Sequence, residues 1–288
     1  MKERVVEYVQ SLQDRICSAL ENFEPGSKFK EVSWNRPGGG GGRTRVLADG
    51  RVFEKAGVNT SVVYGELPDR MAEKLQTKEK KFFATGISLV IHPRSPQVPT
   101  VHANYRYFEQ PDRWWFGGGA DLTPYVPRED LFKHFHQTLM ESCPSRERFD
   151  QWKKECDRYF FISHREETRG IGGIFFDYLN EDRERNFSEV MRMGDAFIPA
   201  YVPIVEKTKD LSFTERQKEF QLLRRGRYVE FNLVYDRGTL FGLETKGNIE
   251  SILMSLPAVA HWSFQADFEA NDEEKRLMSY LRKPSDWV

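Results

Sequence analysis

The chain has 288 residues and a formal net charge of −1 from 43 basic and 44 acidic side chains. It is long enough for one large domain with a substantial core, and its near-neutral charge argues against nucleic acid or an anionic membrane as a partner. The three cysteines form no Cys-x-x-Cys pair and no apolar run approaches the roughly 20 residues of a membrane span, which predicts a cytoplasmic protein.

The N-terminus leads directly into an amphipathic helix, without the pattern of a signal or transit peptide. Apolar residues recur at helical spacing from Val5 to Leu20, and the segment Glu24–Gly26 ends the helix. Five consecutive glycines between Arg36 and Arg43 then predict a loop that is mobile unless a contact orders it. Short strands are expected next, at Thr44–Ala48, Arg51–Lys55 and Thr60–Tyr64.

Two neighbouring strands carry polar side chains on one face. They are expected at Gly86–His92 and Thr100–Phe108, joined by a proline-rich turn. The twofold repeat places one set of polar groups on the same side, namely Ser88, His92, His102, Asn104 and Arg106. Tyr105 faces the other way. Burying these groups is costly without partners, so the face predicts a site for a polar ligand, with the solvated side of an antiparallel sheet as the alternative.

The remaining elements mix strands and helices. Arg113–Phe116 is expected to be a strand that ends at the following glycines, and Gly172–Leu179 a buried strand. Helices are expected at 129–142, 145–160, 184–198 and 213–224, and a β-hairpin over Gly226–Asp236 and Thr239–Leu243. Antiparallel runs of strands with grouped helices predict an α+β fold, a single domain over residues 1–288 with helices packed on a large antiparallel sheet.

One carboxylate, Asp177, lies in an otherwise apolar strand. Such a group needs neighbouring donors or a cationic or N–H-bearing ligand. Arg165 and Arg169 come shortly before this strand, and an internal arginine–aspartate pair that braces the glycine turn is one explanation. Together with Arg106 and the arginines of the glycine-rich loop, these groups favour a substrate with several carboxylates, because guanidinium binds carboxylate in a bidentate way.

Long motifs follow one another along the chain, at Ser88–Arg94, Val98–Arg106, Trp114–Pro124, Arg169–Asp177 and Gly226–Leu243. Together they closely resemble the oxygen-dependent coproporphyrinogen-III oxidases, and the resemblance covers nearly the whole chain. It implies oxidative decarboxylation of two propionate side chains of coproporphyrinogen III to vinyl groups. The implied products are protoporphyrinogen IX, CO2 and H2O2, within haem biosynthesis. The resemblance also implies a homodimer and a large flat antiparallel sheet covered by helices on both faces.

The resemblance further implies roles for individual residues. His102 would be a proton donor, and Arg165 and Asp177 would hold a propionate and the pyrrole N–H groups. The substrate-binding residues would be Ser88, Asn104, Tyr105, Arg106, Lys246, Gly247 and Asn248. Four histidines match residues proposed as divalent-metal ligands in bacterial relatives, namely His92, His102, His136 and His164. The chain departs from the family where Lys246–Asn248 replaces the frequent Gly-Gly-Arg, and at Tyr178, where relatives usually have a second aspartate.

We expect the chemistry to need no organic cofactor. A porphyrinogen is electron-rich and reacts with oxygen by itself, so the protein must mainly orient it and stabilise charge. O2 is then a co-substrate, and a divalent metal is an alternative that we do not favour, because no carboxylate arrangement near the four histidines follows from the sequence. We hypothesise that a buried Asp177 accepts hydrogen bonds from the pyrrole N–H groups and stabilises the cation that forms as electrons leave.

The apolar stretch from Tyr228 to Trp262 contains more apolar surface than one sheet face requires. It predicts the contact of the homodimer within residues 228–263, with an ordinary central hairpin of the core as the alternative. Two other classes compete with the oxidase: a non-catalytic tetrapyrrole-binding protein on the same fold, and a metal-dependent hydrolase or oxygenase that uses the histidines. The first would bind without turnover, and the second would contain stoichiometric metal.

Overall fold

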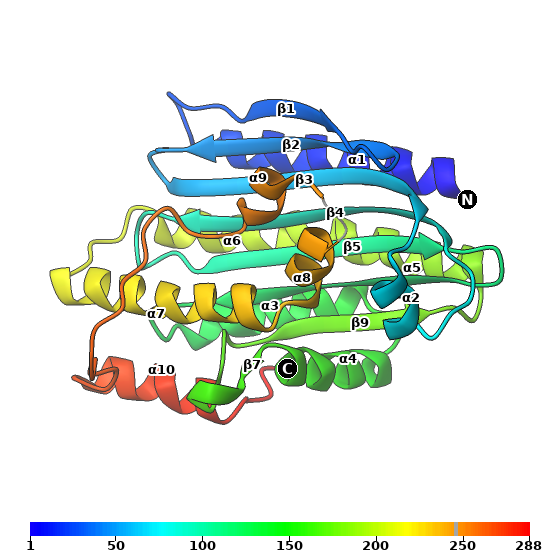
Figure 1. Cartoon of the computed structure of the whole chain (residues 1–288). Coiled ribbons are helices and arrows are strands. Elements are labelled where there is room, and N and C mark those ends of the chain that lie inside the picture. Colours follow the sequence, from blue (N-terminus) through cyan, green and yellow to red (C-terminus); the bar gives the residue numbers. More distant parts are fainter. Residues whose placement is uncertain (245–246) are drawn as a thin grey trace.

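The architecture is organised around a seven-stranded antiparallel sheet. The computed structural model describes residues 1–244 and 247–288. The strands follow the order β1-β2-β3-β4-β5-β6-β9, each antiparallel to its neighbours (Figure 1). They span Lys30–Asn35 (β1), Gly40–Ala48 (β2), Phe53–Glu66 (β3), Lys81–Pro93 (β4), Thr100–Glu109 (β5), Trp114–Thr123 (β6) and Gly173–Leu179 (β9). A separate two-stranded ladder pairs β7 (Phe161–Ile162) with β8 (Glu167–Thr168), around the 3-10 helix Ser163–Arg165.

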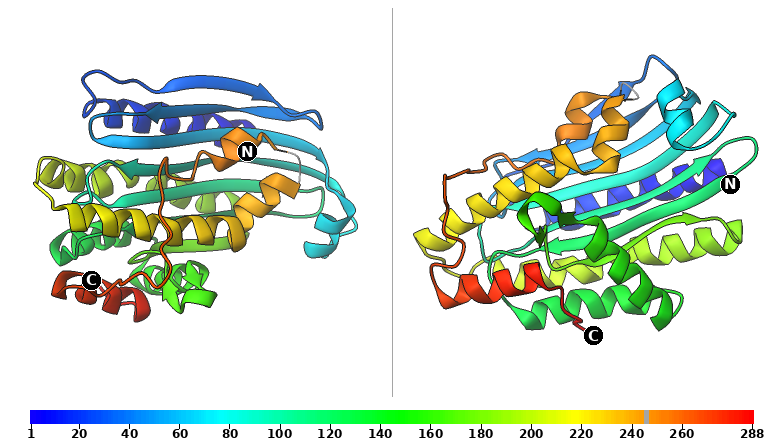
Figure 2. Two further views of the ribbon diagram at one scale, coloured as in Figure 1. Left: turned by 60° about the vertical axis from the view of Figure 1, so that its left-hand side comes forward. Right: turned by 60° about the horizontal axis from the view of Figure 1, so that its bottom comes forward.

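Helices cover both faces of the sheet. They span Lys2–Glu21 (α1), Asp69–Lys74 (α2), Glu129–Ser142 (α3), Arg146–Tyr159 (α4), Arg183–Asp195 (α5), Phe197–Thr208 (α6), Glu215–Val234 (α7), Arg237–Glu244 (α8), Ile249–Leu253 (α9) and Asp272–Arg282 (α10). Figures 1 and 2 place α1, α3, α5 and α6 on one face, and α7, α8 and α9 on the other. The expected α+β fold is therefore confirmed. No helix in the described part of the chain has both the length and the apolar character to cross a membrane.

The main apolar core fills the space between the sheet and the helices α1, α3, α5 and α6. β4 contributes every second residue to it, with Ile87, Leu89 and Ile91 all buried. α1 contributes residues at helical spacing, such as Val9 and Leu12. Because side chains alternate along a strand, the residues between the core positions point to the opposite face. That face carries the polar residues of the two central strands.

Most expected elements are present, with some boundaries moved. The expected strand Thr60–Tyr64 and residues 53–55 of the expected strand Arg51–Lys55 belong to the single long strand β3. This strand has an irregularity between Phe53 and Lys55. β6 does not stop at its glycines but continues through them to Thr123. It can do so because β5 and β9 pair with it on both sides and supply its backbone hydrogen bonds.

The five glycines form a loop only in part, and contacts order them. The first two glycines make the turn between β1 and β2. Gly40–Gly42 are strand residues that pair with β3, and Gly41 and Gly42 also pair with β1. A Cβ on Gly40 would lie 2.0 Å from the carbonyl oxygen of Val62, and one on Gly42 would lie 2.3 Å from the ring of Trp34. The glycines therefore allow close approach of backbone and ring rather than mobility.

The β-hairpin expected over Gly226–Leu243 is wrong, because these residues form the end of α7 and most of α8. The buried residues Tyr228, Phe231 and Asn232 have the spacing i, i+3, i+4 of one helix face. α7 begins with a capping box, in which Thr214 and Gln217 satisfy each other's backbone N–H groups through their side chains. Apolar and polar residues alternate near the end of α7, which is the pattern of a strand. For this reason the sequence predicted a strand there instead of a helix face.

Candidate active site

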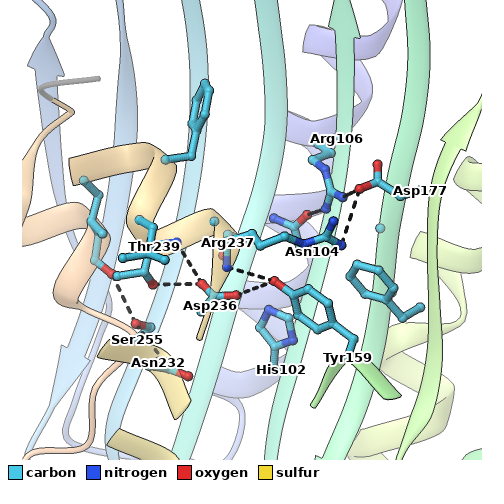
Figure 3. Close-up of a pocket in the computed structure, with 18 of the residues that line it drawn as sticks. His102, Asn104, Arg106, Tyr159, Asp177, Asn232, Asp236, Arg237, Thr239 and Ser255 are labelled. Atoms are coloured by element: carbon cyan, nitrogen blue, oxygen red, sulfur yellow. Dashed lines mark hydrogen bonds and ion pairs between the residues drawn. The ribbon is translucent and has the colours of Figure 1, made fainter. Parts of the chain in front are cut away.

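A cavity of about 670 Å³ lies on the face of the sheet opposite the main core. Strands β3 to β6 and β9 form one side of it, and residues of α4, α7, α8 and α9 form the other. Its polar lining residues include His102, Asn104, Arg106, Asp177, Asp236 and Arg237 (Figure 3). A cavity of this size with converging polar side chains is the first candidate for a ligand site.

Arg106 and Asp177 form an ion pair within this cavity. Nη2 of Arg106 lies 2.9 Å from Oδ2 of Asp177, and Nη1 of Arg106 donates to Oδ1 of Asn104 at 2.8 Å (Figure 3). Nη2 of Arg237 lies 3.8 Å from the same oxygen of Asp177. The side chains of Arg106 and Asp177 are 34% and 16% exposed, so a ligand in the cavity can reach both. The cavity therefore presents a carboxylate between two guanidinium groups.

A glycine in β6 makes room for this ion pair. Gly117 lies directly opposite Arg106 in the register of β5 and β6. A Cβ at this position would lie 2.6 Å from Oδ1 of Asp177 and 2.7 Å from Nη2 of Arg106. The absent side chain thus allows the two charged groups to meet over the strand.

Two buried charged residues, Asp121 and Arg169, hold the ring of His102 at the cavity. Nδ1 of His102 lies 2.8 Å from Oδ1 of Asp121, and Nη2 of Arg169 donates to both oxygens of Asp121 at 2.8 and 2.9 Å. Burial raises the pKa of the Asp121 carboxyl, but Arg169 and His102 outweigh this effect and hold the pKa below its usual range. The anionic Asp121 accepts a hydrogen bond from Nδ1, which leaves Nε2 of His102 for a ligand.

Arg169 is fixed by aromatic rings as well as by Asp121. Its guanidinium carbon lies 4.1, 4.3 and 4.9 Å from three ring centroids, those of Phe160, Tyr228 and Phe231 respectively. Its Nη1 also donates to Oδ1 of Asn232 at 2.9 Å. Cation–π contacts in a desolvated site strengthen such a placement. Arg169 therefore acts as a rigid support for Asp121 and, through it, for His102.

Asp236 brings a further carboxylate to the cavity at the start of α8. Its Oδ2 accepts hydrogen bonds from the backbone N–H and the hydroxyl of Thr239, both at 2.8 Å. Its Oδ1 accepts one from the hydroxyl of Tyr159 at 2.8 Å (Figure 3). Burial raises the pKa of Asp236, but these hydrogen bonds outweigh burial, so the pKa lies below its usual range. Carboxylates therefore face the cavity from both the sheet and α8.

Comparison with known proteins points to one family. A sequence model described as coproporphyrinogen III oxidase matches residues 4–287. The chain is 51% identical to the oxygen-dependent coproporphyrinogen-III oxidase, chloroplastic, of Glycine max, over 100% of this chain and 80% of that protein. It is 47% identical to the oxygen-dependent coproporphyrinogen-III oxidase of Prochlorococcus marinus, over 99% of this chain and 92% of that protein. The chain belongs to the coproporphyrinogen III oxidase family.

The cavity brings together five of the residues that the family resemblance predicted for the site. Ser88, His102, Asn104, Arg106 and Asp177 all line it. The first four come from β4 and β5, where the strand repeat places them on one face, and Asp177 comes from β9. Their shared location supports their assignment to substrate binding and catalysis, which stays a proposal.

Tyr105 and Arg165, which the resemblance also assigned to the site, do not line the cavity. Tyr105 is 1% exposed on the core face, where its hydroxyl donates to the carbonyl oxygen of Met193 at 3.0 Å, so its side chain does not reach the cavity. Arg165 forms a bidentate pair with Glu230 at 2.8 and 2.9 Å. Glu230 is therefore the partner of Arg165, whereas Arg106 and Arg237 lie near Asp177, and a role of Arg165 in holding a propionate stays a prediction.

Lys246–Asn248 is the segment expected to differ from the family pattern, and it lies partly outside the described residues. Lys246 lies outside the described residues. The N–H of Gly247 donates to the carbonyl oxygen of Gly242 at 2.9 Å, and Oδ1 of Asn248 caps α9 by accepting from the N–H of Ser251 at 2.9 Å. Neither Gly247 nor Asn248 lines the cavity, so their contact with substrate remains a prediction.

The four histidines that match proposed metal ligands of family members do not converge. Their ring nitrogens contact separate partners at 2.7 to 2.9 Å: Ser255 for His92, Asp121 for His102, Phe132 for His136, and Tyr235 and Glu230 for His164. Within residues 1–244 and 247–288, no three His, Cys, Asp or Glu side chains are grouped so that they could hold a metal. The donor set does not fit a four-histidine metal site, and no step below passes through a metal.

Sequence reasoning missed three charged residues of the site, Asp121, Asp236 and Arg237. Asp121 lies opposite His102 in the register of β5 and β6, a pairing that follows only when β6 extends through its glycines. Asp236 and Arg237 were assigned to the turn of the incorrect hairpin. The available signal was their position, as two adjacent charges directly after the mainly aromatic and aliphatic residues with which α7 ends.

Proposed function

We propose that this protein is an oxygen-dependent coproporphyrinogen-III oxidase, which converts two propionate side chains of coproporphyrinogen III to vinyl groups in haem biosynthesis. In each step one C–H bond and the bond to the carboxyl carbon break, a C=C bond forms, and CO2 leaves. The hydride equivalent from the C–H bond and one proton reduce O2 to H2O2. Family membership over residues 4–287, together with the charged cavity, supports this function.

The cavity residues suit a substrate that has carboxylate arms and pyrrole N–H groups. Arg106 and Arg237 offer guanidinium groups to a propionate, which fixes the side chain that reacts. Asp177, held between them, accepts hydrogen bonds from the pyrrole N–H groups. Its carboxylate then stabilises the positive charge that develops on the ring as electrons leave, and it does so without reorganisation because the arginines already fix it.

His102 supplies the proton that the reduction of O2 requires. Asp121 and Arg169 hold its ring through Nδ1, and Nε2 remains for the cavity. A histidine with one ring nitrogen held and the other open to the cavity can transfer a proton to a ligand there. O2 is the co-substrate, and the side chains of the protein carry out charge stabilisation and proton transfer, with neither an organic cofactor nor a metal in the scheme.

Aerobic incubation with coproporphyrinogen III tests this function. We expect a vinyl-bearing product together with one CO2 and one H2O2 for each vinyl group, and no conversion under nitrogen. Heat-denatured protein controls for spontaneous oxidation of the porphyrinogen, which forms no vinyl groups. Binding without release of CO2 would instead identify the competing class, a non-catalytic tetrapyrrole-binding protein.

We also propose that the protein is a homodimer whose contact lies within residues 228–263. This segment forms helices and an extended stretch rather than a hairpin, and it exposes several large apolar side chains, namely Leu233, Val234, Ile249, Val259 and Trp262. Single exposed apolar residues are ordinary, but several within one segment favour an interface.

A cytoplasmic location remains a proposal for this chain. The relatives from Glycine max and Arabidopsis thaliana are named chloroplastic, whereas that from Prochlorococcus marinus is not. Fractionation of the source cells tests the proposal, and recovery of the protein with an organelle would contradict it.

A further inference from the structure

β9 contains a β-bulge where it borders the cavity. Phe116 of β6 pairs with Leu179, and Gly118 pairs with Phe176, so Gly117 lies opposite two residues, Asp177 and Tyr178. Phe176 and Leu179 both belong to the main core although they are three positions apart. The extra residue therefore interrupts the alternation of the strand, and Asp177 and Tyr178 both line the cavity. Bulges beside active sites commonly redirect a side chain in this way.

The backbone of Tyr178 adopts an unfavourable conformation. Its φ is 57°, in the left-handed region that glycine, asparagine and aspartate tolerate better than tyrosine. A non-glycine residue in this region persists when its surroundings hold it there, and such residues cluster at ligand sites.

An aromatic ladder that ends at the wall of the cavity contacts Tyr178, and all of its rings except that of Phe82 line the cavity. We use this name for the side chains of Phe82, Phe108, Trp115 and Tyr178, which come from the neighbouring strands β4, β5, β6 and β9. Successive ring centroids along this ladder lie 5.9, 4.3 and 5.1 Å apart. Yet Tyr178 remains 54% exposed, so part of the residue stays accessible to a ligand.

We propose that Tyr178 is a substrate-binding residue whose ring packs against a pyrrole ring of the tetrapyrrole substrate. The proposal rests on the function proposed above and specifies one contact within it. Asp177 and Tyr178 are consecutive and both face the cavity, so a pyrrole whose N–H donates to Asp177 has the ring of Tyr178 beside it. A π-rich pyrrole suits an aromatic wall of this kind. The bulge thus provides two different contacts, a carboxylate and a ring, from adjacent residues.

The substitution Tyr178→Asn separates binding from stability. Asparagine tolerates the left-handed backbone, so the midpoint of thermal unfolding should stay the same or rise. Loss of the ring should weaken binding of coproporphyrinogen III about three- to tenfold. Titration under nitrogen, followed by tryptophan fluorescence, measures the Kd without turnover. Tyr178→Phe, which keeps the ring, should bind within about twofold of the unchanged chain.

Gln265→Asn is the matched control. Gln265 also has a positive φ, of 54°, and is exposed, but it does not line the cavity, so the Kd should not change. A Tyr178→Asn variant that binds coproporphyrinogen III with unchanged Kd would overturn the contact, whatever its unfolding midpoint. A Tyr178→Phe variant that binds as weakly as Tyr178→Asn would also overturn it, because the hydroxyl would then be the binding group.

The outcomes separate this contact from the proposed function. A protein that binds coproporphyrinogen III through Tyr178 but releases no CO2 in air contradicts the oxidase function and leaves the contact standing. A protein that releases CO2 in air, with unchanged affinity in Tyr178→Asn, contradicts only the contact. Absence of any binding by the unchanged chain contradicts both.

Discussion

The two arginine–aspartate pairs around the cavity differ in exposure, and this difference separates their roles. The side chains of Arg169 and Asp121 are each 2% exposed, whereas those of Arg106 and Asp177 are 34% and 16% exposed. Removal of one partner from a buried pair leaves an uncompensated charge, so such a pair serves mainly the structure. A partly exposed pair can accept a ligand group in addition. We therefore infer that Asp121 mainly holds the structure around His102, and that Asp177 stabilises the charge that develops on the substrate.

Asp177→Asn tests whether Asp177 acts in the reaction rather than in the structure. The amide keeps the shape of the side chain but loses the charge that stabilises the oxidised ring, so turnover should fall at least about a hundredfold. The free energy of unfolding should change by less than about 1 kcal/mol, because the site is partly exposed to water. CO2 release and urea denaturation measure the two effects. Asp150→Asn, which removes a carboxylate from a surface pair with Arg146, is the control. Turnover of Asp177→Asn within a few-fold of the unchanged chain would refute the electrostatic role of Asp177.

Single residues show how far the sequence alone could predict the site. The period of a strand is fixed by its backbone, so alternation was enough to place His102, Asn104 and Arg106 on one face. The partner of Arg165 was not predictable, because Glu230 follows 65 positions later in the chain and meets it only through the packing of α7. Alternation also placed Tyr105 on the core face, correctly, where the family resemblance had assigned it to substrate.

Among the elements, β6 shapes the cavity through its glycines. Gly117→Ala would bring a methyl group to 2.6 Å from Asp177 and 2.7 Å from Arg106, and both contacts are ends of side chains that can move. The fold should therefore persist while the ion pair is displaced, so we expect turnover to fall about tenfold or more with little change in the unfolding midpoint.

Gly26→Ala is the matched control for this substitution, since a Cβ at Gly26 meets no atom within 4 Å. It should leave both turnover and stability close to those of the unchanged chain. Full activity of Gly117→Ala would show that the position of the Arg106–Asp177 pair does not matter for the reaction.

The helix α7 shows why some elements could not be predicted. Its apolar and polar residues near the end alternate as in a strand, whereas its buried residues Tyr228, Phe231 and Asn232 follow helical spacing. Which set is buried depends on the sheet and the aromatic neighbours that α7 packs against, and these come from distant parts of the chain. The shorter helices at 129–142 and 146–159 have a clear apolar face of their own, and there the prediction was correct.

At the scale of the whole molecule, two buried histidines link stability to pH. Burial holds the pKa of His92 and His136 below the ordinary value of 6.5, for His136 at about 3. The unfolded chain binds their protons below about pH 6.5 and the folded chain does not, so their contribution to stability is complete above that pH and is lost as the pH falls.

We expect the free energy of unfolding to drop by roughly 2 to 3 kcal/mol between about pH 6 and pH 5 from these two groups. His136→Leu should reduce the slope to about half, since one of the two titrating rings is removed. Urea denaturation at a series of pH values measures this slope. A slope that is the same in the variant would show that His136 does not titrate as its burial requires.

The proposed dimer makes a further prediction at this scale. Leu233 is 46% exposed near the end of α7, within the proposed contact, and Leu233→Arg should yield a monomer because an unpaired charge in an apolar interface is strongly unfavourable. Val32→Arg is the control, at a residue that is 60% exposed on the edge strand β1 and outside residues 228–263. Sedimentation at low concentration distinguishes the states. A folded Leu233→Arg variant that stays dimeric would place the contact elsewhere.

The central claim is that side chains of the protein suffice for the reaction with O2, and turnover by metal-free protein tests it most directly. After exhaustive treatment with a chelator, verified by elemental analysis, the protein is predicted to release CO2 from coproporphyrinogen III in air at the rate of the untreated protein. Loss of this activity, with recovery on addition of a divalent ion, would contradict the claim and assign the chemistry to a metal.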